Sequence, residues 1–257
     1  LSSAASDVYK RQGYGQLEDN YFQSSVIDFD KDRSDRSTYK LLGGSIGFYG
    51  STLNTRQYAT KGYLEKLIAQ VFTGRERFEP GNPQEGYSPS PQERQSWLQI
   101  SYMKEAYHTM GPKFTLGWMA EALYSSKNFS ENYTATMMQA GEFAPTPHSK
   151  LMYNEAFRAN QYVAAGIKPI YVLNDMFQFR TEFYGFTPIF PIKKNALNKA
   201  YYGKAFSRFE YMGEVSVICH LPFGAISAYV NHYSSPRREW NVGMTIGWQL
   251  FNYRFVE

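Results

Sequence analysis

Residues 240–250 read WNVGMTIGWQL, and apolar side chains occupy every second position of this stretch. The apolar set is Trp240, Val242, Met244, Ile246, Trp248 and Leu250. Between them lie the small or polar residues Asn241, Gly243, Thr245, Gly247 and Gln249. Since successive side chains of a strand point to opposite faces, the stretch predicts a strand with one apolar face. About 9–11 residues is also the length that a tilted strand needs to cross a bilayer.

The same alternation recurs upstream. It is found in residues 42–48, 98–102, 114–125, 177–183 and 209–221, and residues 63–72 form a further, more mixed candidate strand. Pro and Gly mark tight turns at 110–112 and 222–224, whereas the connections at 28–36, 79–92 and 187–203 are long and polar. Short turns at one end of the strands and long loops at the other are typical of outer-membrane barrels.

A soluble β-sandwich also alternates in this way, so the two classes must be separated. The clearest predicted strands, 114–125, 209–221 and 240–250, have 11–13 residues, against the roughly 5–6 residues common in globular sheets. Their non-apolar faces carry ionic residues in mid-strand, which suits a polar barrel interior. No apolar run approaches the roughly 20 residues of a membrane helix. The pattern therefore favours an all-β, antiparallel transmembrane barrel.

The composition excludes several classes of function. The chain is 18% aromatic and 19% charged, and its 27 basic residues are interleaved with 23 acidic ones, so no basic stripe for nucleic acid is present. The single cysteine, Cys219, excludes an internal disulfide and a cysteine-based zinc site. The four histidines show no metal-ligand spacing. We expect no metal and no cofactor.

The first twelve residues, LSSAASDVYKRQ, stand apart from the rest. They look like a translated sequencing adapter, and neither a starting Met nor a signal peptide precedes the strands. We therefore expect residues 1–12 to be foreign to the protein. Residues 13–257 are expected to form a partial barrel domain.

The last hairpin carries a family likeness. Residues 221–227, LPFGAIS, followed by the strand from Trp240, resemble the closing strands of the bacterial surface antigen barrel superfamily. The likeness implies about eight to ten strands of a barrel of about 16, with the remaining strands upstream. It also implies an assembly signal read by the barrel assembly machinery. The signal residues would be Trp240, Val242, Met244, Ile246, Trp248, Phe251, Tyr253 and Phe255.

Within that superfamily the chain is most similar to the barrels of patatin-like phospholipases of Bacteroidota. The supporting stretches are GGSIGF at 43–48, TLNTRQYA at 52–59, FRANQYVAAGIKPIY at 157–171 and YMGE at 211–214. The resemblance implies a location in the outer membrane, contact with its lipid, and an acyl hydrolase domain upstream of the barrel.

One motif suggests catalysis within the chain itself. Residues 43–47, GGSIG, match the G-x-S-x-G nucleophile elbow, which places its serine on a sharp turn between a strand and a helix. Residues 48–54, FYGSTLN, do not begin a helix, and no Asp of the chain is followed by Gly to supply the base of a patatin dyad. Ser45 is therefore expected to be an ordinary strand residue. We expect no catalytic residue in this chain.

The remaining candidates are charges on the predicted interior face, namely Glu121, Arg180, Glu182, Arg208, Glu210 and Glu214. They could act as a selectivity or gating network. Mutual pairing is favoured instead, because Arg180/Glu182 and Arg208/Glu210 are same-face neighbours of opposite sign.

Three functions follow from these observations. The favoured one is a barrel that anchors or exports an upstream patatin-like lipid hydrolase. The alternative is the pore of an outer-membrane assembly or translocation barrel. A third, an integral phospholipase, would need a Ser/His pair on the lipid-facing side, for which the sequence offers no convincing candidate.

Overall fold

The computed structural model describes residues 5–23, 32–82, 94–222, 224–235 and 240–248. Ten long strands of these residues form one antiparallel sheet: β1 (Ala5–Tyr21), β2 (Asp35–Ser51), β3 (Gly62–Glu79), β4 (Arg94–Thr109), β5 (Phe114–Ser125), β8 (Gln161–Val172), β9 (Phe177–Pro188), β12 (Glu210–Leu221), β13 (Gly224–Tyr233) and β14 (Trp240–Trp248). Each strand pairs with the next in this order. The described residues contain no helix with the length and apolar character required to cross a membrane.

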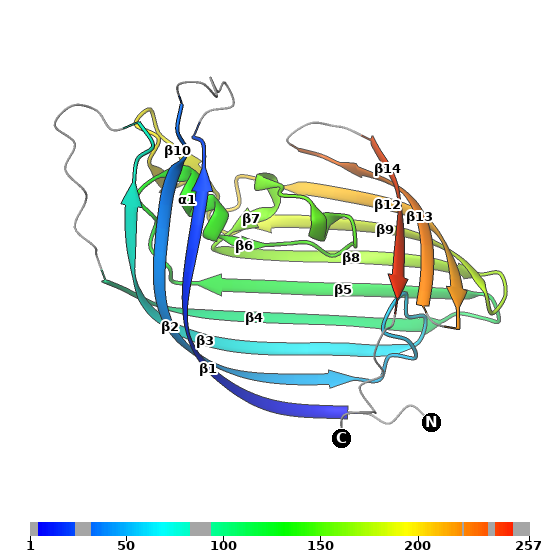
Figure 1. Cartoon of the computed structure of the whole chain (residues 1–257). Coiled ribbons are helices and arrows are strands. Elements are labelled where there is room, and N and C mark those ends of the chain that lie inside the picture. Colours follow the sequence, from blue (N-terminus) through cyan, green and yellow to red (C-terminus); the bar gives the residue numbers. More distant parts are fainter. Residues whose placement is uncertain (1–4, 24–31, 83–93, 223, 236–239, 249–257) are drawn as a thin grey trace.

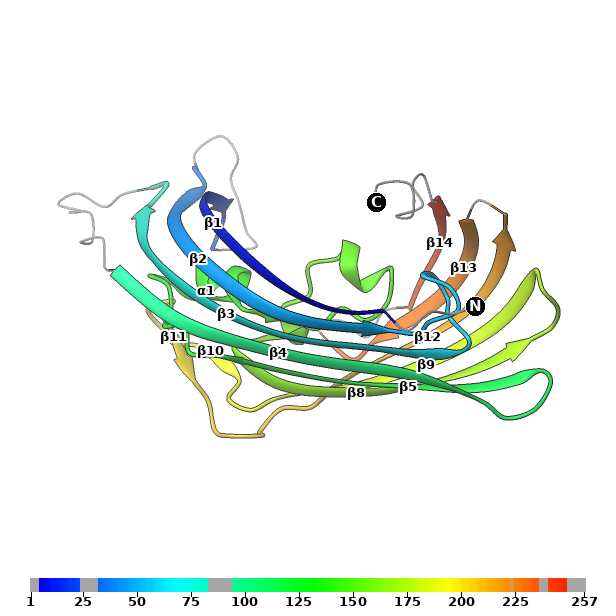
Figure 2. The same cartoon turned by 90° about the horizontal axis from the view of Figure 1, so that it is seen from below.

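The sheet curves into a trough, which Figures 1 and 2 show from two directions. Its edge strands β1 and β14 are not paired with each other in the described part of the chain, so the sheet stays open. Each predicted strand overlaps a long strand of the structure, including the mixed stretch 63–72 in β3, although β12 begins one residue after the predicted 209–221 and residues 249–250 of the last predicted strand lie outside the described residues. The nearly all-antiparallel β architecture is therefore confirmed.

The outward face of the sheet is apolar. Exposed side chains on it include Ile46 of β2, Val71 of β3, Ile100 of β4, Ile167 of β8, Phe179 of β9, Val215 of β12, Val230 of β13 and Met244 of β14. The segment 5–12 of β1, which pairs with residues 44–51, interrupts this face with Lys10 and Gln12. The foreign origin of residues 1–12 stays a prediction.

On the inward face, aromatic rings lie over glycines of the neighbouring strand. The pairs directly opposite in register are Tyr107/Gly117, Tyr184/Gly166, Tyr229/Gly243, Phe72/Gly43 and Tyr9/Gly47. A Cβ atom added at Gly166 would lie 2.2 Å from the Tyr184 ring. The glycines therefore allow these rings to cover the adjacent backbone closely.

The long connection between β5 and β8, residues 126–160, folds into the trough (Figure 1). We call it the inward segment. It contains α1 (Tyr133–Gln139), η1 (Ser149–Leu151), η2 (Glu155–Phe157) and a small ladder of β6 (Gly141–Glu142) with β7 (Arg158–Ala159). Asn132 caps α1 by accepting a hydrogen bond from the backbone N–H of Ala135 at 2.8 Å.

The core of the molecule lies between the inward segment and the sheet. Phe143 and Phe157 of the segment are buried against Tyr162, Phe186 and Tyr233. Burying a side chain of this size stabilises a protein by about 1.5–3 kcal/mol.

One connection differs from its sequence-based description. The stretch 187–203 was expected to be a plain loop, but it contains a hairpin of β10 (Ile192–Lys194) and β11 (Ala200–Tyr202). Most of the predicted loop 79–92 lies outside the described residues.

Candidate functional site

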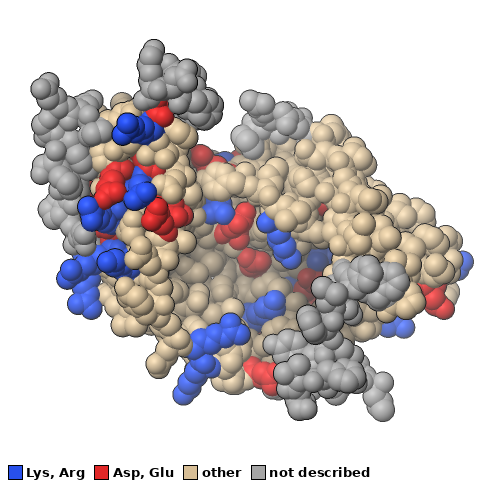
Figure 3. Space-filling model, viewed as in Figure 1, with Lys and Arg blue, Asp and Glu red and all other residues tan. Residues whose placement is uncertain are grey.

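A cavity of about 730 Å³ lies in the trough. Strands β3, β4, β5, β8, β9 and β14 line it, together with the β2–β3 connection and residues 144–151 of the inward segment. Figure 3 looks into this hollow, where basic and acidic side chains lie together. The cavity is therefore the space that the two connections leave free inside the sheet, and it is the candidate site of the chain.

Two buried ion pairs form the wall of the cavity. Lys168 Nζ on β8 lies 3.1 Å from Glu105 Oε2 on β4. Arg180 Nε lies 3.0 Å from Glu182 Oε1, two residues along β9. Because charges removed from water must be compensated, each of these four groups depends on its partner.

Tyrosines join the two pairs into one network. Arg180 donates from Nη2 to the Tyr107 hydroxyl at 3.2 Å, and Tyr107 in turn donates to Glu105. Tyr184 donates to Glu182 Oε2 at 2.7 Å. Hydrogen bonds to ionised groups are stronger than neutral ones, so this network holds its members in fixed positions.

The β2–β3 connection reaches across the trough to the same network. Arg180 Nη1 donates to the Ala59 carbonyl at 3.0 Å, and Gln178 Nε2 donates to the Tyr58 carbonyl at 3.1 Å. The Tyr58 and Ser227 hydroxyl oxygens are 2.6 Å apart. A φ of 54° places Tyr58 in the left-handed region, an uncommon conformation for a residue other than glycine. These contacts fasten the turn to β9 and β13, two strands far from it in sequence.

The predicted interior charges divide between two places. Arg180, Glu182 and Glu121 line the cavity, and Glu121 accepts a hydrogen bond from the Tyr162 hydroxyl. Glu214 on β12 is buried directly opposite Glu182 in register. Glu210 is the first residue of β12, and its Oε1 lies 2.8 Å from Arg208 Nε. Arg208 was expected within a strand, but it precedes β12 in the connection from β9, because the strand begins only at Glu210.

Sequence reasoning missed Lys168, Glu105 and Tyr107. The predicted stretch in β4 ends at residue 102, and no strand is predicted over residues 161–172. Continuing the same parity would have placed Glu105 and Tyr107 on the inward face with Trp97. The partner role of the Ala59 carbonyl has no sequence signal, because it depends on how the turn folds.

At the long-connection end of the sheet, Lys127 lies among aromatic rings. Its Nζ is 5.1 Å from the centre of the Tyr39 ring and 5.0 Å from that of Trp97, and it donates to Gln139 Oε1 at 3.3 Å. Burial lowers the pKa of Lys127 to about 8, against the opposing effect of nearby Glu76. This lysine therefore titrates within an experimentally accessible range.

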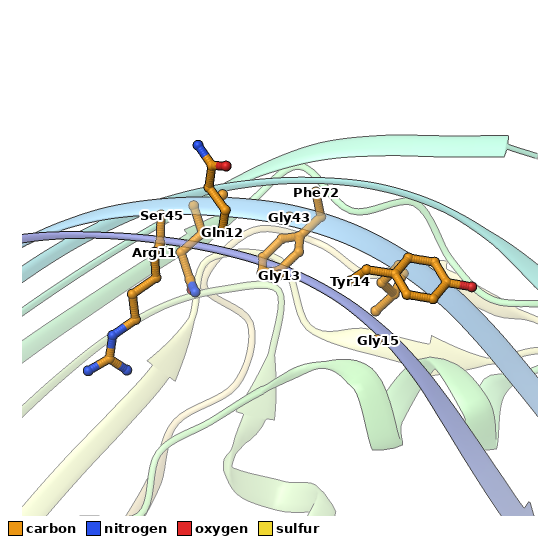
Figure 4. Close-up of a pocket in the computed structure, with 11 residues that line it drawn as sticks. Arg11, Gln12, Gly13, Tyr14, Gly15, Gly43, Ser45 and Phe72 are labelled. Carbon is orange, nitrogen blue, oxygen red and sulfur yellow. The ribbon is translucent and has the colours of Figure 1, made fainter.

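Ser45 lies in the middle of β2, as expected, beside a shallow hollow between β1, β2 and β3 (Figure 4). It pairs in register with Arg11 and Gln70, and β2 continues to Ser51 without a turn into a helix. The lining of the hollow includes no His, Asp or Glu among the described residues. The local geometry is that of a strand and differs from a nucleophile elbow.

The residues of the expected assembly signal lie partly in β14. Trp240, Val242, Met244 and Ile246 are exposed on the outward face of this edge strand, and Trp248 is its last residue. Phe251, Tyr253 and Phe255 lie outside the described residues.

In the described ranges, no three His, Cys, Asp or Glu side chains are grouped so that they could hold a metal ion. Comparison with known proteins adds no relative: no family model, no curated protein and no solved structure matches the chain.

Proposed function

We propose that the chain is the C-terminal, membrane-embedded part of an outer-membrane β-barrel that anchors an upstream patatin-like lipid hydrolase. The single observation that carries the proposal is the contrast between an exposed, apolar outward face of the sheet and an inward face on which buried charged groups lie beside aromatic rings. A soluble sheet of this size would have to cover its apolar face with another layer. In a membrane the lipid performs that role.

The dimensions of the sheet support this proposal. The long strands β5, β8, β9, β12, β13 and β14 have 9–12 residues, close to the roughly 9–11 that a tilted transmembrane strand requires. Within lipid every backbone N–H and C=O must be paired, and only a closed sheet satisfies this. The open edges β1 and β14 would be joined through upstream strands, in a barrel of about 16 strands in all.

The filled trough favours an anchor over a conduit. The inward segment and the β2–β3 connection both occupy the space that a pore would leave open. The alternative function, a translocation or assembly pore, would use the charged cavity as part of a path for its cargo. It would require both connections to move out of the trough.

The hydrolase attachment comes from the family resemblance and is tested on the intact protein. The reading frame upstream of Gly13 would be recovered, and the full-length protein would be assayed for lipid acyl hydrolysis in outer-membrane fractions. We expect hydrolysis that is lost when an upstream elbow serine is changed and is retained in Ser45→Ala. An upstream region made of periplasmic modules, with no hydrolase, would favour the pore instead.

A further inference from the structure

The outward face of β2, β3 and β4 changes character near the long connections. Two rows across these strands are apolar, formed by Ile46, Ala69 and Ile100, and by Gly44, Val71 and Leu98. The next row holds Leu42 with the hydroxyl residues Thr73 and Ser96. Beyond it the residues in register are Lys40, Arg75 and Arg94, which we call the cation row.

The cation row places three like charges directly opposite one another. Lys40 faces Arg75, and Arg75 faces Arg94, on adjacent strands and all exposed. Neighbouring strands are about 4.8 Å apart, so the row spans about 10 Å. Like charges in directly opposed positions destabilise a sheet unless something neutralises them.

The cations that lie closer to the strand ends than the cation row are neutralised by carboxylates, whereas in the described part of the chain the members of the row are not. Arg36 pairs with Glu18 at 3.2 Å, and Arg77 pairs with Glu79 at 2.8 Å. Among the described residues, no carboxylate pairs with any member of the cation row, and Arg94 donates only to the Thr73 hydroxyl, at 3.2 Å. A groove of about 240 Å³ on this face is lined by Lys40 and Arg75 together with the ion-paired residues Glu18, Arg36, Arg77 and Glu79. In Figure 3, basic and acidic side chains lie interspersed over this end of the sheet.

We propose that the cation row binds the phosphorylated headgroup of a membrane lipid. This inference rests on the proposed membrane location. The lipid chains would lie along the apolar rows that end at Val71 and Leu98, and the phosphate would accept hydrogen bonds from the row above. Arginine matches phosphate geometry through its planar pair of N–H groups, and the Thr73 and Ser96 hydroxyls lie at the boundary between chain and headgroup.

The experiment uses the full-length protein in dodecyl maltoside micelles and measures its equilibrium binding of fluorescent diphosphoryl lipid A. The test variant is K40Q/R75Q/R94Q. The matched control is K113Q/K193Q/K204Q, which removes three exposed charges from connections. Losing three charge-assisted contacts should weaken binding about ten-fold or more, and the control should bind as the wild type does. Monophosphoryl lipid A should bind the wild type more weakly than the diphosphoryl form.

Three outcomes would overturn the inference. Equal losses in both variants would mean that general charge attraction explains the binding. Equal affinity for monophosphoryl and diphosphoryl lipid would mean that the row does not bind the phosphate that distinguishes the two forms. Inorganic phosphate that displaces the lipid at equal concentration would indicate a free-anion site. Carbonate extraction of the wild type tests the barrel separately. Release of the protein from membranes would contradict the proposed function. Retention in membranes, together with unchanged lipid binding by the test variant, would contradict only the proposed role of the cation row.

Discussion

Strands β9 and β3 follow the same alternating pattern but differ in what covers their inward faces. In β9 the inward side chains from Gln178 to Phe186 are all buried. In β3 no residue is buried, although the strand is paired on both sides. The inward segment packs against β9 and its neighbours, whereas Leu64 and Lys66 of β3 face the cavity. Strand pairing therefore decides which face of the sheet a side chain points to. Whether that side chain is buried depends on what fills the trough.

Truncating a ring of the inward segment should separate the two regions most strongly. Phe157→Ala removes a buried ring from between Phe186 and Tyr233 and should lower the free energy of unfolding by about 3–5 kcal/mol. Phe72→Ala, at an inward ring of β3, should cost clearly less. Urea unfolding in detergent, monitored by the shift of the folded band on gels, measures both. Equal losses of stability in the two variants would contradict the difference in burial between the inward faces of β9 and β3.

Removing a cation from the buried network should lower the free energy of unfolding by a similar or slightly smaller amount than Phe157→Ala does. Arg180→Ala leaves Glu182 buried without its partner and frees the Ala59 carbonyl, so it should destabilise by about 3–5 kcal/mol. Lys66→Ala serves as the control, because Lys66 faces the cavity from β3 and acts on Glu121 only at longer range, with no ion pair among the described residues. The same unfolding assay applies, and a large loss for Lys66→Ala would contradict the assignment.

The aromatic–glycine pairs offer a finer comparison. Gly166→Ala pushes a methyl group into the Tyr184 ring, and the hydrogen bond of Tyr184 to Glu182 holds this ring in place. The substitution should therefore lower the free energy of unfolding by about 1–3 kcal/mol. Gly43→Ala meets the Phe72 ring at 2.6 Å, but this ring is only partly buried and can turn aside. If Gly43→Ala proved the more damaging of the two, ring mobility would not explain the difference.

The smallest expected effect is a dependence on pH. The pKa of Lys127 is lowered in the folded protein, so the unfolded chain binds more protons between about pH 8 and the ordinary lysine value near 10.4. Stability should therefore rise with pH across this window as the buried charge is lost. The melting temperatures of wild type and Lys127→Met would be compared at pH 7.5 and 9.5. We expect the advantage of the variant to shrink at the higher pH, and a constant difference would argue against the lowered pKa.

Much of the sheet was predictable because alternation is local. The parity of residues 177–183 and 209–221 alone placed Glu182 and Glu214 on one face, and the structure brings them into direct register. The candidate site was predictable only in part. Arg180 was recognised through its neighbour Glu182, whereas its partners Tyr107 and Ala59 are 73 and 121 residues away in sequence.

By itself the sequence determined seven of the ten long strands and which of their faces is apolar, because a period of two residues decides which side chains share a face. Only the tertiary structure decided that residues 126–160 and the turn containing Tyr58 fold inward. Periodicity cannot report this, since the packing of Phe143 and Phe157 depends on rings from strands that come together only when the sheet curves. The cation row is likewise a product of register, which aligns Lys40, Arg75 and Arg94 from three separate strands.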